Sequence, residues 1–260
     1  PPRSTPLYSS AASDVYKRQS LTMEPENSVA LGFGFRCGFL GLMHLEIIQE
    51  RLEREYDLDL IVTAPSVAYQ VVLQDQSVVK IDNPSKLPDV SSINQIQEPI
   101  LNVTIVTPSR HVGTIMELMH SKRSEFKRME YIQGVNTSES DATESDQSRV
   151  MMEYVMPLAE MLADFHNQLK SRTQGYASLD YTFEGYAAAP LVKVDILVNH
   201  MPVEALSSIL HRDLAVTQGR AIAEKLRTTI PRQLFEVPIQ AAIGARIIAR
   251  ETVRPLRKDV

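Results

Sequence analysis

The chain has 260 residues, of which 43% are hydrophobic and 23% charged, with a formal net charge of −5. These values are ordinary for a globular protein of about two domains, with three small domains as the alternative. No apolar run approaches the ~20 residues of a membrane-spanning helix. The single cysteine, Cys37, excludes an intrachain disulfide and fits a reducing compartment, although a disulfide-free secreted protein stays open.

Residues 1–19 differ in composition from the rest of the chain. They are rich in Pro and Ser, show no periodicity, and carry Lys17 and Arg18 without the apolar stretch of a signal peptide. The string SAASDVYKRQ in this segment resembles translated read-through of a sequencing adapter. We therefore expect a non-native, disordered leader and exclude it from the prediction of the fold.

A run of four glycines opens the first domain, which we place at residues 20–96. Gly32, Gly34, Gly38 and Gly41 resemble a nucleotide-binding loop. The dinucleotide fingerprint G-x-G-x-x-G is not matched, because three residues and not two separate Gly34 from Gly38. A phosphate loop is not matched either, because no glycine is followed by lysine. The glycines are better explained by tight turns and by close approach of a strand to a helix.

The first domain has a predicted β-α-β-β order. We expect a strand at 29–35, an amphipathic helix at 39–55, and strands at 58–63 and 67–73. Prolines then punctuate a loop-rich stretch up to a boundary near residue 96.

The second domain, residues 97–186, has the clearest pattern. Periodicity predicts four strands and two helices in the order βαββαβ, at 101–106, 110–123, 127–132, 150–155, 157–169 and 176–183. That order is the ferredoxin-like or split βαβ arrangement, in which two helices cover an antiparallel sheet. The acidic, low-complexity segment 137–148 predicts a disordered loop.

The third domain, residues 187–260, predicts a small α/β unit. We expect a strand, a helix and a second strand, at 191–198, 214–229 and 234–242. Pro238 predicts an edge position for the last strand, because proline cannot donate a ladder hydrogen bond. The predicted fold class is α+β, with tandem ferredoxin-like two-layer sandwiches followed by the small α/β C-terminal domain.

No pattern of catalysis or metal binding is found. The six histidines are scattered, and no H-E-x-x-H, C-x-x-C or G-x-S-x-G string occurs. His211-Arg212-Asp213 resembles a kinase catalytic loop but lacks its companion motifs. We therefore predict no catalytic residue, cofactor site, metal site or small-molecule substrate for this chain.

Charge is distributed unevenly along the chain. Residues 186–260 contain 11 Lys and Arg against 7 Asp and Glu, a net charge of +4, whereas residues 1–185 contain 16 against 25, a net charge of −9. A basic C-terminal third indicates an anionic partner such as nucleic acid, although a solvated charged face has the same composition.

A series of cations near the end of the chain is the main candidate for RNA binding. Four arginines are spaced 4, 4 and 3 residues apart and a lysine follows them: Arg246, Arg250, Arg254, Arg257 and Lys258. On one helix they would share a face suited to phosphate contacts. Pro255 opposes a continuous helix, so a strand followed by a helix is the alternative.

Five other cations are further candidates for RNA contact. They are Lys170 and Arg172 on a predicted loop, Lys122 and Arg123 at a helix end, and Arg36 in the glycine run. The pair at the helix end also suits the helix dipole without any RNA. Arg36 lies where backbone amides could face a phosphate.

Six strings resemble one protein family. They are ALGFGFRCGFLGLMHLEIIQERLEREYDLDLIVTAPSVAY, NPSKLPD, LKSRTQGYASLDY, LVKVDILVN, IPRQLFEVPIQAAIGARIIARETV and LRKDV, in this order from about residue 20 to the end. The family is that of the LepA translation factors, also called elongation factor 4. The resemblance implies an N-terminally truncated elongation-factor-G-like domain III at 20–96, a domain V at 97–186, and a C-terminally truncated family-specific domain at 187–260.

The same resemblance implies a function for the intact parent. It would be a ribosome-dependent GTPase that binds GTP and Mg²⁺ in a G domain missing from this chain. Its implied partners are ribosomal RNA, ribosomal proteins and tRNA, and we expect a monomer. The implied location is the bacterial cytoplasm, in part with peripheral association at the membrane, and an organellar matrix is the alternative. Back-translocation, translational fidelity and ribosome biogenesis stay open as its role.

Two functions from other classes also stay open. A stand-alone ferredoxin-like module that senses a ligand or oligomerises would show the same second domain. An enzyme with an unrecognised site would need a deep pocket with titratable groups of shifted pKa.

Overall fold

The computed structural model describes residues 21–28, 32–63, 65–132, 148–162 and 164–256. The predictions for residues 1–19 and for nearly all of 137–148 fall outside this part of the chain. The elements form two compact units. One comprises the described parts of residues 1–64, 194–208 and 216–260, and the other those of 65–193 and 209–215.

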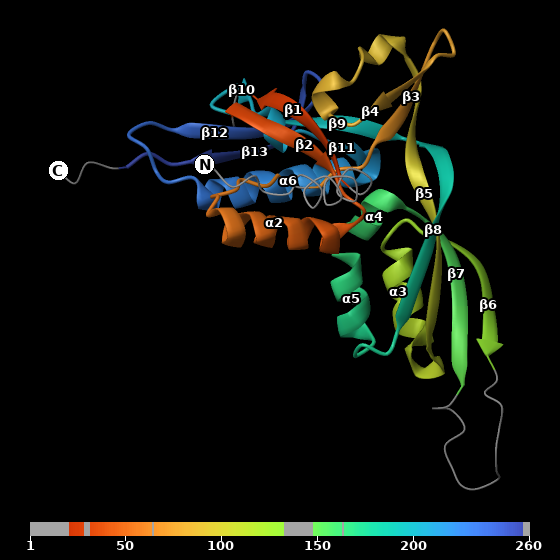
Figure 1. Ribbon diagram of the computed structural model, residues 1–260. Helices are drawn as coiled ribbons and strands as arrows, with labels where there is room; N and C mark the ends of the chain where they lie inside the picture. Colours follow the sequence, from red (N-terminus) through yellow and green to blue (C-terminus); the bar gives the residue numbers. More distant parts are fainter. Residues whose placement is uncertain (1–20, 29–31, 64, 133–147, 163, 257–260) are drawn as a thin grey trace, which may run out of the picture. The chain divides into compact units, whose positions relative to one another are not determined.

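A four-stranded antiparallel sheet with helices on one face forms the ferredoxin-like module (Figure 1). Its elements are β5 (Ile93–Pro108), α3 (Val112–His120), β6 (Glu125–Ile132), β7 (Arg149–Pro157), α4 (Leu158–Leu162), α5 (Phe165–Arg172) and β8 (Ser178–Ala189). Its strands are ordered β8-β5-β7-β6. The predicted α+β class and the βαββαβ order are therefore confirmed.

The second helix of this module is interrupted, where the sequence predicts one helix at 157–169. Asp164, between α4 and α5, has a left-handed backbone conformation with φ of 56°. Aspartate tolerates this conformation because its short side chain can bond locally. Here its Oδ1 accepts a hydrogen bond from Asn167 Nδ2 at 2.9 Å.

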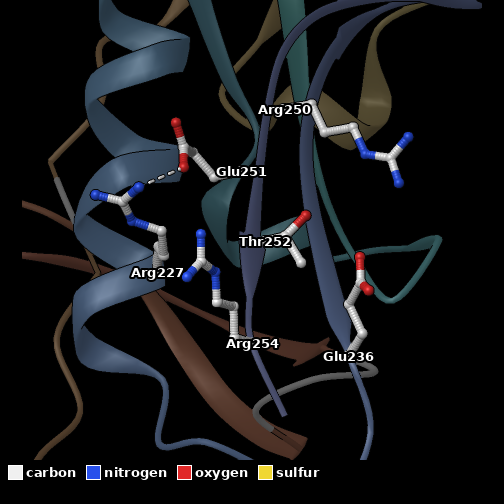
Figure 2. A pocket seen from close by; sticks show the side chains of 6 residues that line it. All are labelled: Arg227, Glu236, Arg250, Glu251, Thr252 and Arg254. Carbon is white, nitrogen blue, oxygen red and sulfur yellow. Dashed lines mark hydrogen bonds and ion pairs between the residues drawn. The ribbon is translucent and has the colours of Figure 1, made fainter.

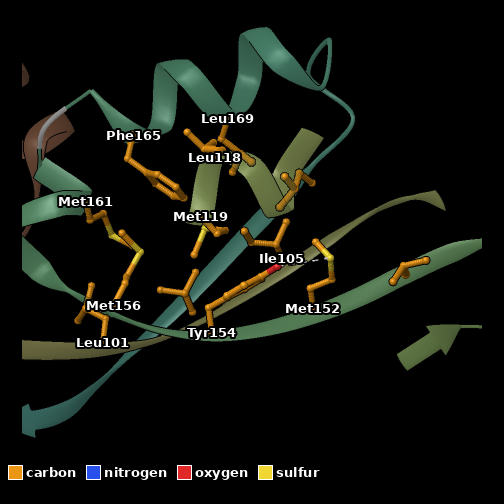
Figure 3. Close-up of a cluster of buried hydrophobic side chains, with 13 residues drawn as sticks. Leu101, Ile105, Leu118, Met119, Met152, Tyr154, Met156, Met161, Phe165 and Leu169 are labelled. Atoms are coloured by element: carbon orange, nitrogen blue, oxygen red, sulfur yellow. Dashed lines mark hydrogen bonds between the residues drawn. The ribbon is translucent and has the colours of Figure 1, made fainter. Parts of the chain in front are cut away.

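The core of the module lies between the sheet and its helices (Figure 3). Alternate residues of β5 and β7 point toward the helices, as period-two strands require. Fully buried members include Val103, Ile105, Met152, Met156, Leu118, Met119 and Phe165. Each such side chain contributes roughly 1.5–3 kcal/mol by leaving water. This burial fixes the helices, and hence the loops at their ends, on the sheet.

Two further strands, β3 (Tyr69–Leu73) and β4 (Val78–Ile81), extend the same sheet. The 3₁₀ turns Pro84–Lys86 and Val90–Ser92 connect β4 to β5. On one side of the long β5, β3 pairs with its first residues and β7 with its last nine, and β8 pairs along most of the other side. A smaller core that includes Val71, Ile81 and Ile96 forms at this end.

The N-terminal segment forms a hairpin and one helix. They are β1 (Thr22–Ser28), β2 (Gly32–Gly38) and α2 (Leu42–Tyr56). The predicted strand at 58–63 is not formed, because no described strand pairs with it and Leu58, Ile61 and Val62 stay exposed. The helix prediction is confirmed, and Gly41 before it has a φ of 155° that favours glycine.

The C-terminal sheet has the order β10-β9-β12-β13, with β11 also paired to β9. Its elements are β9 (Leu191–Val198), β10 (Met201–Pro202), β11 (Ser208–His211), α6 (Arg212–Thr229), β12 (Val237–Ile243) and β13 (Arg246–Val253), with a 3₁₀ turn at Glu204–Leu206. The predicted strand at 191–198 and helix at 214–229 are confirmed.

Pro238 lies in an inner strand, so the predicted edge position is wrong. β12 is flanked by β9 and β13. The Pro238 carbonyl accepts a hydrogen bond from the Asn199 N–H at 2.8 Å, just beyond the last residue of β9. The proline nitrogen points to the same side, where the neighbouring strand has ended. The missing donor therefore leaves no ladder hydrogen bond open.

Gly219 is explained by close approach of α6 to the sheet. A Cβ added at this position would lie 3.1 Å from Ala241 Cβ and 3.1 Å from Ile248 Cδ1. Glycine costs a helix about 1 kcal/mol relative to alanine. Here that cost allows the helix to pack directly on β12.

Candidate nucleic-acid interface

The arginine series lies on a β-strand and not on a helix. β13 covers Arg246–Val253 and pairs with β12. The prediction of one continuous helix is therefore wrong, and the strand expected in the alternative, a strand followed by a helix, is confirmed. Residues 254–256 have no regular structure, so the helix of that alternative does not begin there. Arg257 and Lys258 lie outside the described residues.

A β-bulge separates Arg246 from Arg250. On β12, Arg246 pairs with Ile243 and Arg250 pairs with Gln240, three residues away. Paired residues share a face of the sheet, and successive residues change face. The two arginines therefore lie on opposite faces, and the single basic face expected from their spacing is not formed.

Arg250 and Arg254 line an open pocket of about 500 Å³ at β13, the outer strand of the sheet (Figure 2). Arg227 of α6 and Glu251 of β13 form an ion pair in it, with 2.8 Å between Nη1 and Oε2. Figure 2 shows the Arg254 side chain directed toward this pair and Arg250 directed away from it. Glu236 and Thr252 complete the lining.

The pocket carries a net positive charge, with three arginines against two glutamates. Arg250 and Arg254 are exposed, and neither forms an ion pair with a carboxylate in the part of the chain that the structure describes. Such side chains can exchange counterions for phosphates. They also discourage another strand from adding to this edge, a structural role that needs no ligand.

Lys170 and Arg172 form a second exposed cationic group. Both lie in the last turn of α5, not on the loop after it, and both are exposed. Neither has an ion-pair partner among the residues that the structure describes. Their position at a helix C-terminus favours positive charge through the helix dipole. The structure therefore brings these two candidates together on one helix end.

Arg123 is held by carboxylates inside the module. Its Nη1 and Nη2 donate to Glu98 at 2.8 and 3.0 Å, and its Nε donates to Glu160 at 2.8 Å. Glu98 and Glu160 are both buried. Burial opposes the charge, but the hydrogen bonds that Arg123 donates to both carboxylates hold the pKa of Arg123 above its usual value. We therefore remove Arg123 from the candidate RNA contacts.

The two remaining candidates are less suited to RNA than the sequence indicates. Arg36 forms an ion pair with Glu26 on the neighbouring strand, with 2.8 Å between Nε and Oε2. Lys122 is half-buried in the turn that follows α3. Neither offers the exposed charge of Arg250 or Lys170.

Comparisons with known proteins cover most of the chain. Residues 95–197 match the family model of the elongation factor G C-terminus, and residues 198–260 match that of the GTP-binding protein LepA C-terminus. Proteins named elongation factor 4 from Acetivibrio thermocellus, Ruminiclostridium cellulolyticum and Clostridium novyi are 56%, 55% and 54% identical over 241 residues. The chain belongs to the LepA family. Each match covers 93% of this chain and 38% of the relative's length.

The two cationic groups lie in segments that match different family models. The pocket with Arg250 and Arg254 lies in the LepA C-terminal match, and Lys170 and Arg172 lie in the elongation factor G C-terminal match. The chain thus corresponds to the C-terminal part of a LepA-type translation factor.

The uncovered face of the ferredoxin-like sheet does not resemble an RNA-binding platform. RNA-binding sheets of this type present aromatic side chains on which bases stack. Here the outward positions include the polar or acidic residues Asn102, Thr104, Glu130, Glu153, Asp180 and Thr182. Arg128 on this face is paired with Glu130 and Glu153. Arg149 of β7 is also exposed on this face of the LepA module, whereas Lys170 and Arg172 lie at the end of α5.

No cluster of three His, Cys, Asp or Glu that could hold a metal ion occurs among the described residues. No helix in that part of the chain is long and apolar enough to cross a membrane.

Sequence reasoning missed two residues that the structure places beside the candidate sites. Arg227 reaches Glu251, 24 residues away in the chain, and no local pattern marks such a contact. Tyr176 lies in the string QGY directly after the α5 cations. Its short distance in sequence from Lys170 and Arg172 could have identified it as a candidate for the same site.

Proposed function

We propose that this chain is the ribosome-binding and RNA-binding part of a LepA-type translation factor. The proposal depends on Arg250 and Arg254 at the edge of the C-terminal sheet. Both are exposed, and no carboxylate in the described part of the chain forms an ion pair with either of them. Phosphates of RNA would neutralise them and release counterions.

The ferredoxin-like module would supply a second contact through Lys170 and Arg172. Two basic groups on separate folded parts suit a large polyanion such as the ribosome, with tRNA as the further partner of the C-terminal domain. The proposed mechanism is docking by shape and charge, with no chemical step in this chain.

The chemistry of the longer protein is also a proposal. GTP hydrolysis, with GTP and Mg²⁺, belongs to a G domain outside this chain, and the docked domains would couple it to the ribosome. We place the protein in the cytoplasm as a monomer, with peripheral association at the membrane face. Docking on the ribosome is compatible with each of the three roles, which are back-translocation, translational fidelity and ribosome biogenesis.

Binding of the chain to purified ribosomes at low and at high salt tests the proposal. We expect saturable binding whose affinity falls steeply with salt concentration, because phosphate contacts release counterions. Absence of binding, or binding that does not change with salt, would contradict it. A ligand-sensing or oligomerising module would instead show a concentration-dependent change of mass without ribosomes.

A further inference from the structure

An exposed tyrosine lies beside the α5 cations. Tyr176 is in the loop between α5 and β8, and 58% of its surface is exposed. Backbone hydrogen bonds hold this loop against the helix end: the Gly175 N–H donates to the Lys170 carbonyl, and the Tyr176 N–H donates to the Thr173 carbonyl, both at 2.9 Å. These hydrogen bonds hold the backbone of Tyr176 in place beside the end of α5.

One face of the Tyr176 ring is occupied by its neighbours. The Arg110 guanidinium carbon lies 4.9 Å from the ring centroid, and the His111 ring is nearly parallel to it, 17° apart with centroids separated by 6.2 Å. Arg110 Nε also donates to His111 Nε2 at 3.1 Å.

That short hydrogen bond determines which face stays open. Groups stacked on opposite faces of a ring are about 7 Å apart, twice the ~3.5 Å contact distance. Arg110 and His111 are bonded to each other and so cannot sandwich Tyr176. They cover one side of the ring, and the high exposure of Tyr176 places its other face in solvent.

We propose that the open face of Tyr176 stacks on an unpaired RNA base while Lys170 and Arg172 contact the adjacent phosphates. This rests on the proposed RNA binding of the chain, and it names a separate contact and the kind of nucleotide that it takes.

The chemistry of the loop favours RNA over a protein partner. Every base has a face that can stack on an aromatic ring, and stacking is tolerant of sequence. Lys170 and Arg172 lack ion-pair partners within the described residues and suit the phosphates on either side of such a base. The proposed site does not include the acidic segment 137–148 between β6 and β7. Nearly all of that segment lies outside the described residues.

A fluorescence experiment tests stacking directly. The chain contains no tryptophan, so Tyr176→Trp introduces a single reporter. We expect a short unstructured RNA to quench this indole and its blunt-ended duplex to quench it little, because paired bases are stacked on each other. Tyr131→Trp is the matched control, since Tyr131 is 63% exposed on β6 of the same module and should show no quenching with either RNA.

Affinity measurements provide the second arm. Tyr176→Ala should weaken binding of the unstructured RNA by about five-fold or more, whereas Tyr176→Phe keeps the ring and should bind like the wild type. Duplex affinity should not change in either variant. Unquenched Tyr176→Trp fluorescence, together with wild-type affinity in Tyr176→Ala, would overturn the proposal.

The two proposals fail differently. If Arg250→Ala weakens binding of both RNAs and Tyr176→Ala weakens neither, RNA binding stands and the stacking site is rejected. If the wild-type chain binds neither RNA nor ribosomes, the proposed function itself is rejected.

Discussion

Arg123 and Glu98 are joined by two parallel hydrogen bonds of 2.8 and 3.0 Å, with only 4% of the Glu98 side chain exposed. The arginine lies just after α3, and the glutamate lies in the middle of β5. A third bond from Arg123 to Glu160 at the start of α4 makes it the link between a strand and two helices. The sequence marks this arginine as a surface cation, yet it is a structural one.

Removing the Arg123 guanidinium should strongly destabilise the protein. Arg123→Ala leaves two buried carboxylates without a partner, and we expect a loss of about 3–5 kcal/mol in the free energy of unfolding, measured with urea. Adding Glu98→Gln to that variant should recover part of the loss. Arg128→Ala, which breaks an exposed pair with Glu153, is the control and should have a much smaller effect. Equal effects of the two arginine substitutions would contradict the structural role.

Tyr69 should make stability fall at alkaline pH. Its hydroxyl donates to the Ile209 carbonyl at 3.1 Å, and burial together with the charge of Glu98 raises its pKa from 10.0 to about 12. The unfolded chain loses this proton first, so the contribution is fully present below pH 10 and is lost as pH rises to 12. The loss should reach about 3 kcal/mol at most.

Tyr69→Phe isolates that contribution. The variant should be less stable at neutral pH by about 1 kcal/mol, because the hydrogen bond is removed. Its stability should then fall less steeply than that of the wild type between pH 10 and 12. Parallel curves from urea unfolding at each pH would show that another group controls the alkaline transition.

Gly219 should resist substitution although it lies in a helix. Gly219→Ala would place a Cβ 3.1 Å from Ala241 Cβ, which belongs to the backbone-fixed strand β12. We expect a loss of about 1 kcal/mol instead of the usual gain in helix stability. Gly113→Ala in α3 is the matched control: nothing lies within 4 Å of its added Cβ, and it should stabilise by about 0.5–1 kcal/mol. A stabilising Gly219→Ala in denaturant titrations would contradict the close packing.

Arg250 and Arg246 offer a charge-matched test of the RNA interface. Both are exposed on β13, but only Arg250 lines the pocket with Arg254. We expect Arg250→Ala and Arg254→Ala each to weaken ribosome binding and to lower the salt slope by about 0.7–0.9, the value for one phosphate contact. Arg246→Ala should change both far less. A uniform response of all three would indicate diffuse attraction without a defined site.

The ferredoxin-like module could be predicted because its signals are local. Alternation in 101–106 and helical spacing in 110–123 both follow from residues close in the chain, and the structure has β5 and α3 at these places. The partners of single side chains could not be predicted this way. Arg123 meets Glu98 across 25 residues, and the bulge opposite Ala241 turns Arg246 away from Arg250. Equal spacing fixes a common face only where the backbone stays regular.

The length of β5 has a mechanical consequence. Its 16 residues hold β3 at one end and β7 at the other, and β8 along most of the length. Cleaving the chain between Ile96 and Gln97 would cut the strand that joins the hairpin of β3 and β4 to the rest of the described sheet. The hairpin of β3 and β4 and the ferredoxin-like module should therefore melt in a single step, and the amides of 93–108 should be among the last to exchange with deuterium.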